Sequence, residues 1–518
     1  MARDSLFGED RVCGVVVAAT SREMWRQLRQ ALLYTRTAEL RLDWLESDPE
    51  LRRFLILLRR KKFSWRTTLI ATCRRRTAGG RFSRSISAQL AVLQRAIAAG
   101  CRWIDLEIES VEESSAFALD LCTANARRIL SFHDFRGTPG KSALARLMTK
   151  LEQTARTADF DAVKIATKCD SIGESLRVLA LARGKRNVIA VPMGETATPA
   201  RVLALREGSA LAYGPVEVAT APGQVSLPAM TKLYRAGSLD RQTRVYGVIG
   251  DPIGHSLSPI LHNTGFVARR VNAVFLPFLV RDMHDFAAAI GPLRIAGFAV
   301  TLPHKERILR YLDVCDPLVA RIGAVNTAVV HGQGKLFGYN TDYVGVLRAL
   351  ERRMPIAGRR VLILGAGGVA RAVAFALARG SATISICARR PERARKLARA
   401  VNGEAIPRTA LRHECFDAIV NATPVGMHPQ EDYSPLEERE LNCRLVFDTI
   451  YRPRETKLLQ LAAQRGIKTV SGLEMFLAQG FAQWEIWMGE RAPEVAMRAA
   501  VVEALRREER PEDGRRRK

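Results

Sequence analysis

The sequence has no apolar run near the roughly 18 residues that a membrane-spanning helix needs. Its nine cysteines form no CxxC pair, and their odd number fits neither a disulfide framework nor a zinc ribbon. Residues 1–11 lack the apolar segment of a signal peptide. These absences, with a hydrophobic content of 47%, predict a globular cytosolic protein that binds no metal.

Lysines and aromatic residues are also scarce. Only 14 of the 80 basic residues are lysines, and aromatic residues make up 7% of the 518-residue chain. The net charge of +27 invites a nucleic-acid-binding interpretation, but the arginines are spread along nearly every expected helix. A surface that follows a nucleic acid needs clustered charge and stacking aromatics. We therefore expect no nucleic-acid partner and a basic field that favours small anionic substrates. The sequence is consistent with either a monomer or a dimer.

The first half of the chain alternates short β-rich runs with helical segments, which predicts a (β/α)8 TIM barrel in an α/β protein. The runs occupy residues 12–19, 38–44, 68–74, 103–109, 128–135, 162–167, 187–193 and 209–214. Lys164 alternates with its apolar neighbours, and the charged residues around Glu39 and Arg41 share one face. Because the outer face of a barrel packs on helices, these polar side chains should point inward, where they usually serve catalysis.

The pattern changes after a linker at residues 236–243. Residues 245–259 are typical of a strand that feeds a Gly/Pro/Ser loop, and residues 359–380 of an apolar strand, a glycine turn and a helix. We expect three domains. They are the barrel at 1–238, an α/β substrate domain at 244–345 and 471–518, and a Rossmann domain inserted in it at 346–470.

Lys164 is the strongest candidate nucleophile of the first half. A lysine forms a Schiff base with a ketone only as the neutral amine, and we expect burial and inward-facing arginines to lower its pKa. The segments ELR (39–41), TCR (72–74) followed by GG (79–80), SFHDF (131–135), VKIAT (163–167), PMGE (192–195) and APGQ (221–224) surround it in order. Together they resemble the type I 3-dehydroquinate dehydratases over about residues 10–235.

The resemblance implies that Lys164 forms an imine with the ketone of 3-dehydroquinate, and that His133 removes the α-proton and then helps the hydroxyl leave as water. The implied substrate-binding residues are Glu39, Arg41, Arg74, Arg201, Thr220 and Gln224. Thr220 stands where the family usually has serine. Ala78 stands where it usually has a glutamate that binds the catalytic histidine. Because Asp105 and Glu107 share a face that should point inward, we expect one of them, with Asp105 favoured, to reach His133 instead, and we expect dehydration to proceed at a reduced rate.

The glycine turn GAGGVA (365–370) follows a strand and opens a helix, as a dinucleotide site requires. Gly365 would make the turn, Gly367 would let the backbone approach a pyrophosphate, and Ala370 would allow close helix–strand packing. After the next strand, an enzyme that binds NAD carries an acid for the ribose. This chain has Arg389 and Arg390 there, which predicts NADP.

Seven segments in order resemble the shikimate dehydrogenases over about residues 244–510. They are GDPIGHSLSP (250–259), VTLPHKE (300–306), GAVNT (323–327), YNTD (339–342), NATPVGM (421–427), DTIYRP (448–453) and GLEMFLAQG (472–480). The resemblance implies that Lys305 and Asp342 form the catalytic pair at the ketone of 3-dehydroshikimate. The implied substrate-binding residues are Ser256, Ser258, Thr301, Asn326, Tyr451 and Gln479. The implied cofactor-binding residues are Gly365, Ala366, Gly367, Gly368, Ala370, Arg389, Arg390, Thr423, Met427 and Gly472.

The tandem order predicts a bifunctional enzyme of the shikimate pathway that catalyses two consecutive steps, as in the plant fused enzymes. A rival hypothesis is a quinate dehydrogenase beside a weakened dehydratase. Retention of Ser258 and Thr301 favours shikimate, because quinate use in the resembling plant enzymes accompanies their loss. Two further hypotheses are a nucleic-acid-binding protein on an inactive scaffold, and a dehydrogenase whose barrel is only structural.

Overall fold

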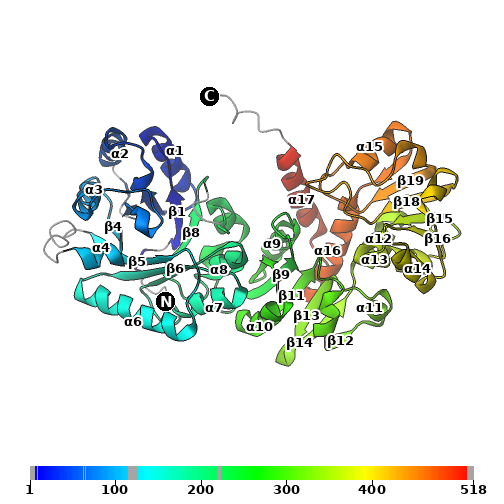
Figure 1. Ribbon diagram of the computed structural model, residues 1–518, viewed down its shortest axis with the longest axis horizontal. Coiled ribbons are helices and arrows are strands. Elements are labelled where there is room, and N and C mark those ends of the chain that lie inside the picture. The colour runs from blue at the N-terminus through cyan, green and yellow to red at the C-terminus, as the bar shows by residue number, and fades with distance from the viewer. Residues whose placement is uncertain are drawn as a thin grey trace. The chain divides into compact units, whose positions relative to one another are not determined.

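The structure is a computed structural model, and it describes residues 6–509 except 9, 62, 65, 115–125 and 219–222 (Figure 1). Its contacts divide the chain into two compact units. The first comprises Met1–Arg244 and Asn272–Arg294, and the second comprises Val245–Val271 and Ile295–Lys518. Thr220, predicted to bind substrate, lies outside the described residues. Eight of the nine cysteines are described, and all eight are free.

A parallel eight-stranded sheet with the order β7-β6-β5-β4-β3-β2-β1-β8 dominates the first unit. Its strands are β1 (Val12–Val16), β2 (Thr37–Arg41), β3 (Thr68–Thr72), β4 (Trp103–Glu107), β5 (Arg127–Asp134), β6 (Ala162–Lys168), β7 (Val188–Met193) and β8 (Ala212–Pro215). β1 pairs with both β2 and β8, and β8 also contacts β7. The sheet therefore closes almost completely, which confirms the predicted barrel.

Helices alternate with these strands around the barrel (Figure 1). They are α1 (Ser21–Ala31), α2 (Asp48–Arg60), α3 (Ile86–Ala98), α4 (Ile108–Glu113), α6 (Lys141–Thr157), α7 (Ile172–Ala180) and α8 (Thr198–Leu203). Side-chain caps start several of them, since Ser47, Ser85 and Ser171 each accept a backbone N–H of the first turn. The first unit also contains β10 (Ala273–Leu279) and α10 (Met283–Leu293).

The inside of the barrel changes from apolar to polar along the strands. Trp103, Ile129 and Ala162 belong to one buried cluster. Two residues further along the same three strands come Asp105, Ser131 and Lys164, which are also buried. Because side chains alternate along a strand, the polar set lies one layer closer to the carboxyl ends, where barrel enzymes hold their active sites.

The second unit contains two sheets. In the first, β9 (Arg244–Gly250), β11 (Ile295–Val300), β13 (Thr327–His331), β14 (Lys335–Tyr339) and β12 (Val314–Cys315) follow one another. β11 runs parallel to β9, and β13 runs antiparallel to both β11 and β14. The carboxyl ends of β9, β11 and β14 and the amino end of β13 therefore meet at one edge. The helices of this region are α9 (Ser258–Ala268), α11 (Pro317–Ile322), α16 (Gly472–Met488) and α17 (Glu494–Glu509).

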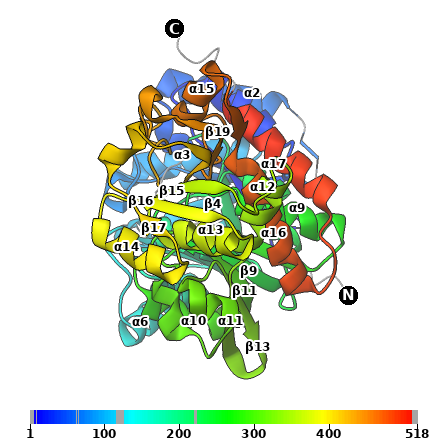
Figure 2. The ribbon, with the colours of Figure 1, turned by 90° about the vertical axis from the view of Figure 1, so that its right-hand side faces the viewer.

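The other sheet is wholly parallel, with the order β17-β16-β15-β18-β19-β20. Its strands are β15 (Arg360–Leu364), β16 (Thr383–Cys387), β17 (Glu404–Ala405), β18 (Phe416–Asn421), β19 (Cys443–Asp448) and β20 (Lys468–Val470). Its helices are α12 (Asp342–Glu351), α13 (Gly368–Arg379), α14 (Pro391–Ala400) and α15 (Lys457–Gln464), of which α13 and α14 pack on the β15–β16 pair (Figure 2). The strand order reverses between β15 and β18, which confirms the Rossmann fold.

Within the described ranges, no helix is both long and apolar enough to cross a membrane.

Two candidate active sites

Lys164 lies inside the barrel on β6, with 5% of its surface exposed. Its Nζ donates to Glu39 Oε1 at 3.1 Å and to Asp105 Oδ2 at 3.0 Å, and it lies 4.2 Å from the ring centroid of Tyr213. The sequence predicted that burial and inward-facing arginines would lower the pKa of this amine, and this effect stays a prediction. Its direct hydrogen-bond partners are the two carboxylates.

His133 lies close to Lys164, because β5 and β6 are neighbours and both side chains point inward. Burial, and then the charges of Arg74 and Lys164, lower the pKa of His133 well below its usual value. The expectation that Asp105 would bind His133 is wrong. Asp105 Oδ1 accepts from Arg74 and Ser131, and its Oδ2 accepts from Lys164. The nitrogen that contacts the ring is Arg74 Nη1, 3.3 Å from His133 Nδ1.

Two further arginines of this site differ in their partners. Arg41 forms a fork with both oxygens of Asp43 at 2.9 Å. Arg201, on α8, is 5% exposed, and its Nε has no hydrogen-bond partner among the described residues. Burial lowers the pKa of Arg201 to about 10. A buried guanidinium without a carboxylate partner is suited to an anionic ligand. Gln224 lies just beyond the undescribed residues 219–222.

Sequence reasoning placed Asp43 and Ser131 on inward faces without giving them a role, and it missed Thr72. Thr72 donates to Glu39 at 2.9 Å, Ser131 donates to Asp105 at 2.6 Å, and Asp43 accepts the fork of Arg41. Thr72 alternates with apolar residues on an inward face, so parity could have identified it as well.

The second site assembles where β11, β13 and β14 meet. Lys305 follows β11, and its Nζ donates to Asp342 Oδ2 at 2.5 Å. The other oxygen of Asp342 accepts from Asn326 Nδ2 at 2.8 Å. Lys305 is 9% exposed, Asp342 5% and Asn326 2%. The structure thus brings the predicted catalytic pair together and holds its carboxylate on both oxygens.

Surrounding amide and hydroxyl groups fix this pair. Asn326 also donates to Gln479, a predicted substrate-binding residue on α16, at 3.3 Å. Asn326 Oδ1 accepts from the Thr341 backbone N–H at 2.7 Å and from Thr327 Oγ1 at 2.8 Å. Gln483, one helical turn beyond Gln479, donates to the backbone oxygen of Asn326 at 3.2 Å. The sequence did not single out Thr327, Thr341 or Gln483, because they support Asn326 and carry no chemistry of their own.

The remaining predicted substrate-binding residues come from loops around the same sheet edge. Ser256 and Ser258 follow β9, and the backbone N–H of Ser258 donates to Ser256 Oγ at 3.3 Å. Thr301 follows the parallel neighbour β11. The ring of Tyr451 packs against that of Phe476 on α16, with the centroids 4.5 Å apart and the planes tilted by 31°. The roles of these four side chains in substrate binding stay predictions.

The glycine turn lies between β15 and α13. Gly365 has a φ of +108°, and an added Cβ would lie 2.9 Å from the backbone oxygen of Ala422, so the turn requires glycine. A Cβ on Gly367 would meet nothing within 4 Å, whereas one on Gly368 would lie 3.3 Å from the Lys305 side chain. The turn is therefore open at Gly367 and directly beside Lys305, a member of the predicted catalytic pair, at Gly368.

The other predicted cofactor residues frame this turn. Thr423 donates to Asn421 Oδ1 at 2.7 Å, which fixes the start of the loop after β18, and exposed Met427 lies in the same loop. Gly472 opens α16, where a Cβ would collide with the backbone oxygens of Thr449 and Ile450. Arg389 and Arg390 follow β16 and are exposed. No acidic side chain in the described part of the chain pairs with either arginine. Ala366 and Ala370 lie in and just after the turn.

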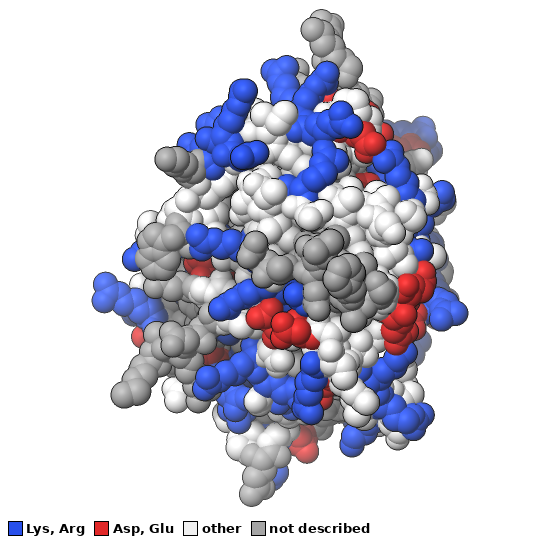
Figure 3. All heavy atoms as spheres, turned by 90° about the vertical axis from the view of Figure 1, so that its left-hand side faces the viewer, with Lys and Arg blue, Asp and Glu red and all other residues white. Residues whose placement is uncertain are grey.

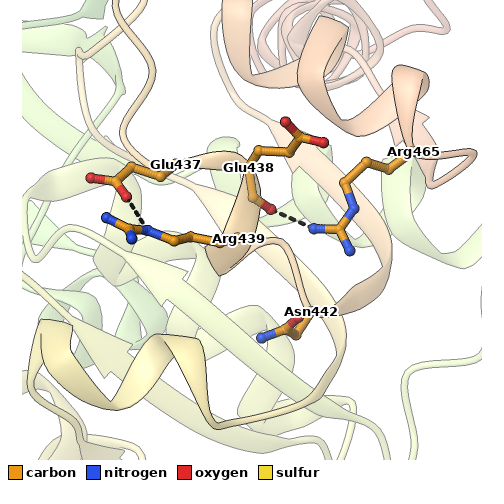
Figure 4. A pocket seen from close by; sticks show the side chains of 5 residues that line it. All are labelled: Glu437, Glu438, Arg439, Asn442 and Arg465. Carbon is orange, nitrogen blue, oxygen red and sulfur yellow. Dashed lines mark hydrogen bonds and ion pairs between the residues drawn. The ribbon is translucent and has the colours of Figure 1, made fainter.

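A surface depression of this region is not part of either site. Glu437, Glu438, Arg439, Asn442 and Arg465 line it (Figure 4). They precede β19 and β20, so they lie at the amino edge of the sheet, opposite the glycine turn. Within it, Arg439 pairs with Glu437, and Arg465 donates to the backbone oxygen of Glu438.

Family models match nearly the whole length of the chain. Type I 3-dehydroquinase matches residues 12–240, and the shikimate dehydrogenase substrate-binding domain matches residues 248–328. Shikimate / quinate 5-dehydrogenase matches residues 348–455, and the shikimate 5'-dehydrogenase C-terminal domain matches residues 472–502. These matches define a two-part α/β enzyme, a lyase barrel followed by an oxidoreductase.

Individual proteins are similar to nearly the whole chain or to about half of it. The chloroplastic bifunctional 3-dehydroquinate dehydratase/shikimate dehydrogenase of Arabidopsis thaliana is 32% identical over 515 residues, which cover 95% of this chain and 84% of that protein. The NADP(+) shikimate dehydrogenase of Moorella thermoacetica is 43% identical and covers 51% of this chain and 94% of its own. A shikimate dehydrogenase crystallised with NADP+ is 36% identical over 52% of this chain and 97% of its own, with a TM-score of 0.49. The chain belongs to the family of bifunctional 3-dehydroquinate dehydratase/shikimate dehydrogenases.

Proposed function

We propose that the chain catalyses two consecutive reactions, dehydration of 3-dehydroquinate to 3-dehydroshikimate and NADPH-dependent reduction of that product to shikimate. The observation that carries this proposal is the presence of two buried lysines, Lys164 and Lys305, each held by carboxylates at the strand edge where its fold places an active site. The chain's membership of the bifunctional family supports both reactions.

In the barrel, Lys164 passes a proton to Glu39 or Asp105 and attacks the substrate ketone. Loss of water gives a protonated imine, whose nitrogen receives the electron pair released when the adjacent C–H bond breaks. His133 removes that proton as a base and then, as an acid, helps the hydroxyl leave as water. Arg201 fits the substrate carboxylate, because it is the buried guanidinium of this site whose Nε has no partner among the described residues. Arg41, Thr220 and Gln224 would complete the pocket.

In the second site, Lys305 donates a hydrogen bond to the ketone oxygen and gives its proton to the alkoxide that forms. Asp342 orients the amine, and Asn326 holds the second oxygen of Asp342. Hydroxyl and amide groups suit a polyol acid, because each buried hydroxyl needs a partner. The residues that would supply them are Ser256, Ser258, Thr301, Tyr451 and Gln479.

The glycine turn and its neighbours fit NADP. Gly365 has the conformation that the turn needs, Gly367 leaves room for a pyrophosphate, and the exposed Arg389 and Arg390 suit a 2′-phosphate. When bound, NADPH supplies the hydride of the reduction. Ala366, Gly368, Ala370, Thr423, Met427 and Gly472 would shape the rest of its site.

Arg389→Ala is expected to weaken NADPH binding by roughly 10- to 100-fold, because a charged hydrogen bond to phosphate contributes about 1.5–3 kcal/mol. NADH, which lacks the phosphate, should bind as before. Titration of both cofactors by fluorescence measures this difference. Arg379→Ala is the matched control, because Arg379 lies at the end of α13 that is remote from the glycine turn. Equal weakening of NADPH and NADH would contradict the phosphate role.

We also propose the remaining features of the enzyme. It acts in the cytosol on small molecules without a nucleic-acid partner, and its domains span 1–238, 244–345 with 471–518, and 346–470. On the face in Figure 3, basic side chains are interspersed with acidic and uncharged ones, which argues against a continuous track for nucleic acid.

The direct test of the function adds 3-dehydroquinate and NADPH to the purified chain. Shikimate should appear as NADPH absorbance falls. If NADPH is consumed only when 3-dehydroshikimate is supplied, the barrel is structural. If quinate with NADP+ is oxidised faster than shikimate, the quinate dehydrogenase hypothesis is right.

A further inference from the structure

The guanidinium of Arg74 is fixed beside His133 by its other acceptors. Nη2 donates to Asp105 Oδ1 at 2.8 Å, and Nη1 donates to Ser131 Oγ at 2.9 Å while lying 3.3 Å from His133 Nδ1. Arg74 is 3% exposed. Burial alone would lower the pKa of Arg74, but the nearby carboxylates, Asp105 first, raise it above its ordinary value. The guanidinium therefore keeps its protons and can only donate.

This donor determines which nitrogen of His133 carries hydrogen. A neutral imidazole has one N–H and one lone pair. The depressed pKa of His133, caused by burial and by Arg74 and Lys164, keeps the ring neutral near pH 7. Because Arg74 donates to Nδ1, the lone pair lies on Nδ1 and the hydrogen on Nε2. A base that accepts a proton through Nε2 needs the opposite arrangement.

The inward carboxylates of β4 are committed to other donors. Asp105 is occupied by Arg74, Ser131 and Lys164. Glu107 accepts the Arg75 backbone N–H at 2.8 Å and Gln89 Nε2 at 2.7 Å. The short helix Arg76–Ala78 packs against β5, which carries His133, but the buried side chain at its end is the methyl of Ala78.

We propose that Arg74 is a positioning residue that holds His133 in the Nε2–H tautomer, and that the dehydratase is limited by proton abstraction for this reason. The proposal rests on the proposed Schiff-base function of the barrel. Before abstraction, Nε2 must lose a proton and Nδ1 must gain one, both exchanged with water, so the ring stays neutral and its contact with Arg74 breaks. Nε2 can then take the substrate proton, as the C–H electron pair moves toward the imine nitrogen.

Substitution of Ala78 tests the proposal by supplying the missing acceptor. Ala78→Glu places a carboxylate beside β5 that can accept from Nδ1–H and so favours the productive tautomer. A histidine in the wrong tautomer lowers kcat by about 10⁴-fold in a serine protease triad, so we expect Ala78→Glu to raise the dehydration kcat by at least about 10-fold. Ala78→Met is the matched control, because it adds similar volume without an acceptor, and it should not raise kcat.

The readout that a structural effect would not reproduce is the tautomer itself. The chain has eight histidines. Nitrogen-15 NMR of the full-length protein, with His133→Gln to assign the signal, should show His133 protonated on Nε2 in the unmodified chain and in Ala78→Met. It should show Nδ1–H in Ala78→Glu. A His133 that is doubly protonated or protonated on Nδ1 in the unmodified chain near pH 7 overturns the proposal.

Kinetics with 3-dehydroquinate deuterated next to the ketone provide a second test. The unmodified enzyme should show a primary isotope effect on kcat, and the effect should shrink in Ala78→Glu. An isotope effect absent from the unmodified enzyme overturns the proposal. Failure of the Schiff-base function itself would be recognised separately, because borohydride would then trap no adduct on Lys164 whatever the tautomer of His133.

Discussion

Replacement of Lys164 by alanine is expected to lower kcat for dehydration by about 10⁴-fold or more, because removal of a covalent nucleophile abolishes the intermediate rather than weakening it. Reduction of 3-dehydroshikimate should continue at its normal rate, because Lys305 and Asp342 belong to the other unit. Separate assays of the two half-reactions in one preparation measure both effects. The intact dehydrogenase activity then reports that the variant chain has folded.

Lys168→Ala is the matched control for this substitution. Lys168 ends the same strand, but its side chain is 45% exposed and pairs with Asp170 at the surface. It should leave dehydration nearly unchanged. Borohydride added with 3-dehydroquinate should leave a mass adduct on the peptide that contains Lys164. Normal dehydration by Lys164→Ala, or an adduct mapped to another lysine, would contradict the imine assignment.

The fold was predictable because its signals are local. Each barrel strand is a short β-rich run bounded by turns, and alternation at Glu39, His133 and Lys164 correctly indicated which side chains face inward. The Rossmann sheet was predictable for the same reason, since Gly365 follows an apolar strand and begins a helix.

Contacts across the barrel were not predictable, because parity gives direction but not distance. Asp105 was correctly expected to face inward, yet its position in the ring of strands places it against Lys164 and Arg74 rather than His133. The same limit applies to the partners of Lys164. The sequence shows inward arginines and inward carboxylates alike, and the partners of Lys164 come from β2 and β4, strands that do not pair with β6.

Substitution of Lys305 should have the complementary effect, loss of the dehydrogenase activity with the dehydratase unaffected. Lys305→Ala should lower kcat for reduction of 3-dehydroshikimate by about 10²–10⁴-fold, the range for loss of a group that transfers a proton in the transition state. Asp342→Asn should act in the same direction, since an amide cannot accept both the Lys305 amine and the Asn326 amide without presenting a donor to one of them. Dehydration should be unaffected in both variants. Steady-state assays of each half-reaction, with exposed Lys335→Ala as the control, measure these changes.

The double variant Lys305→Ala/Asp342→Asn decides whether the two residues act as one unit. If Asp342 works by orienting the amine of Lys305, the carboxylate has nothing to orient once that amine is gone. The double variant should therefore lose little more activity than Lys305→Ala alone, as in other catalytic groups that act together. Losses that multiply would instead give Asp342 an independent contact with the substrate. A rise in KM with unchanged kcat would move Lys305 from proton transfer to substrate binding.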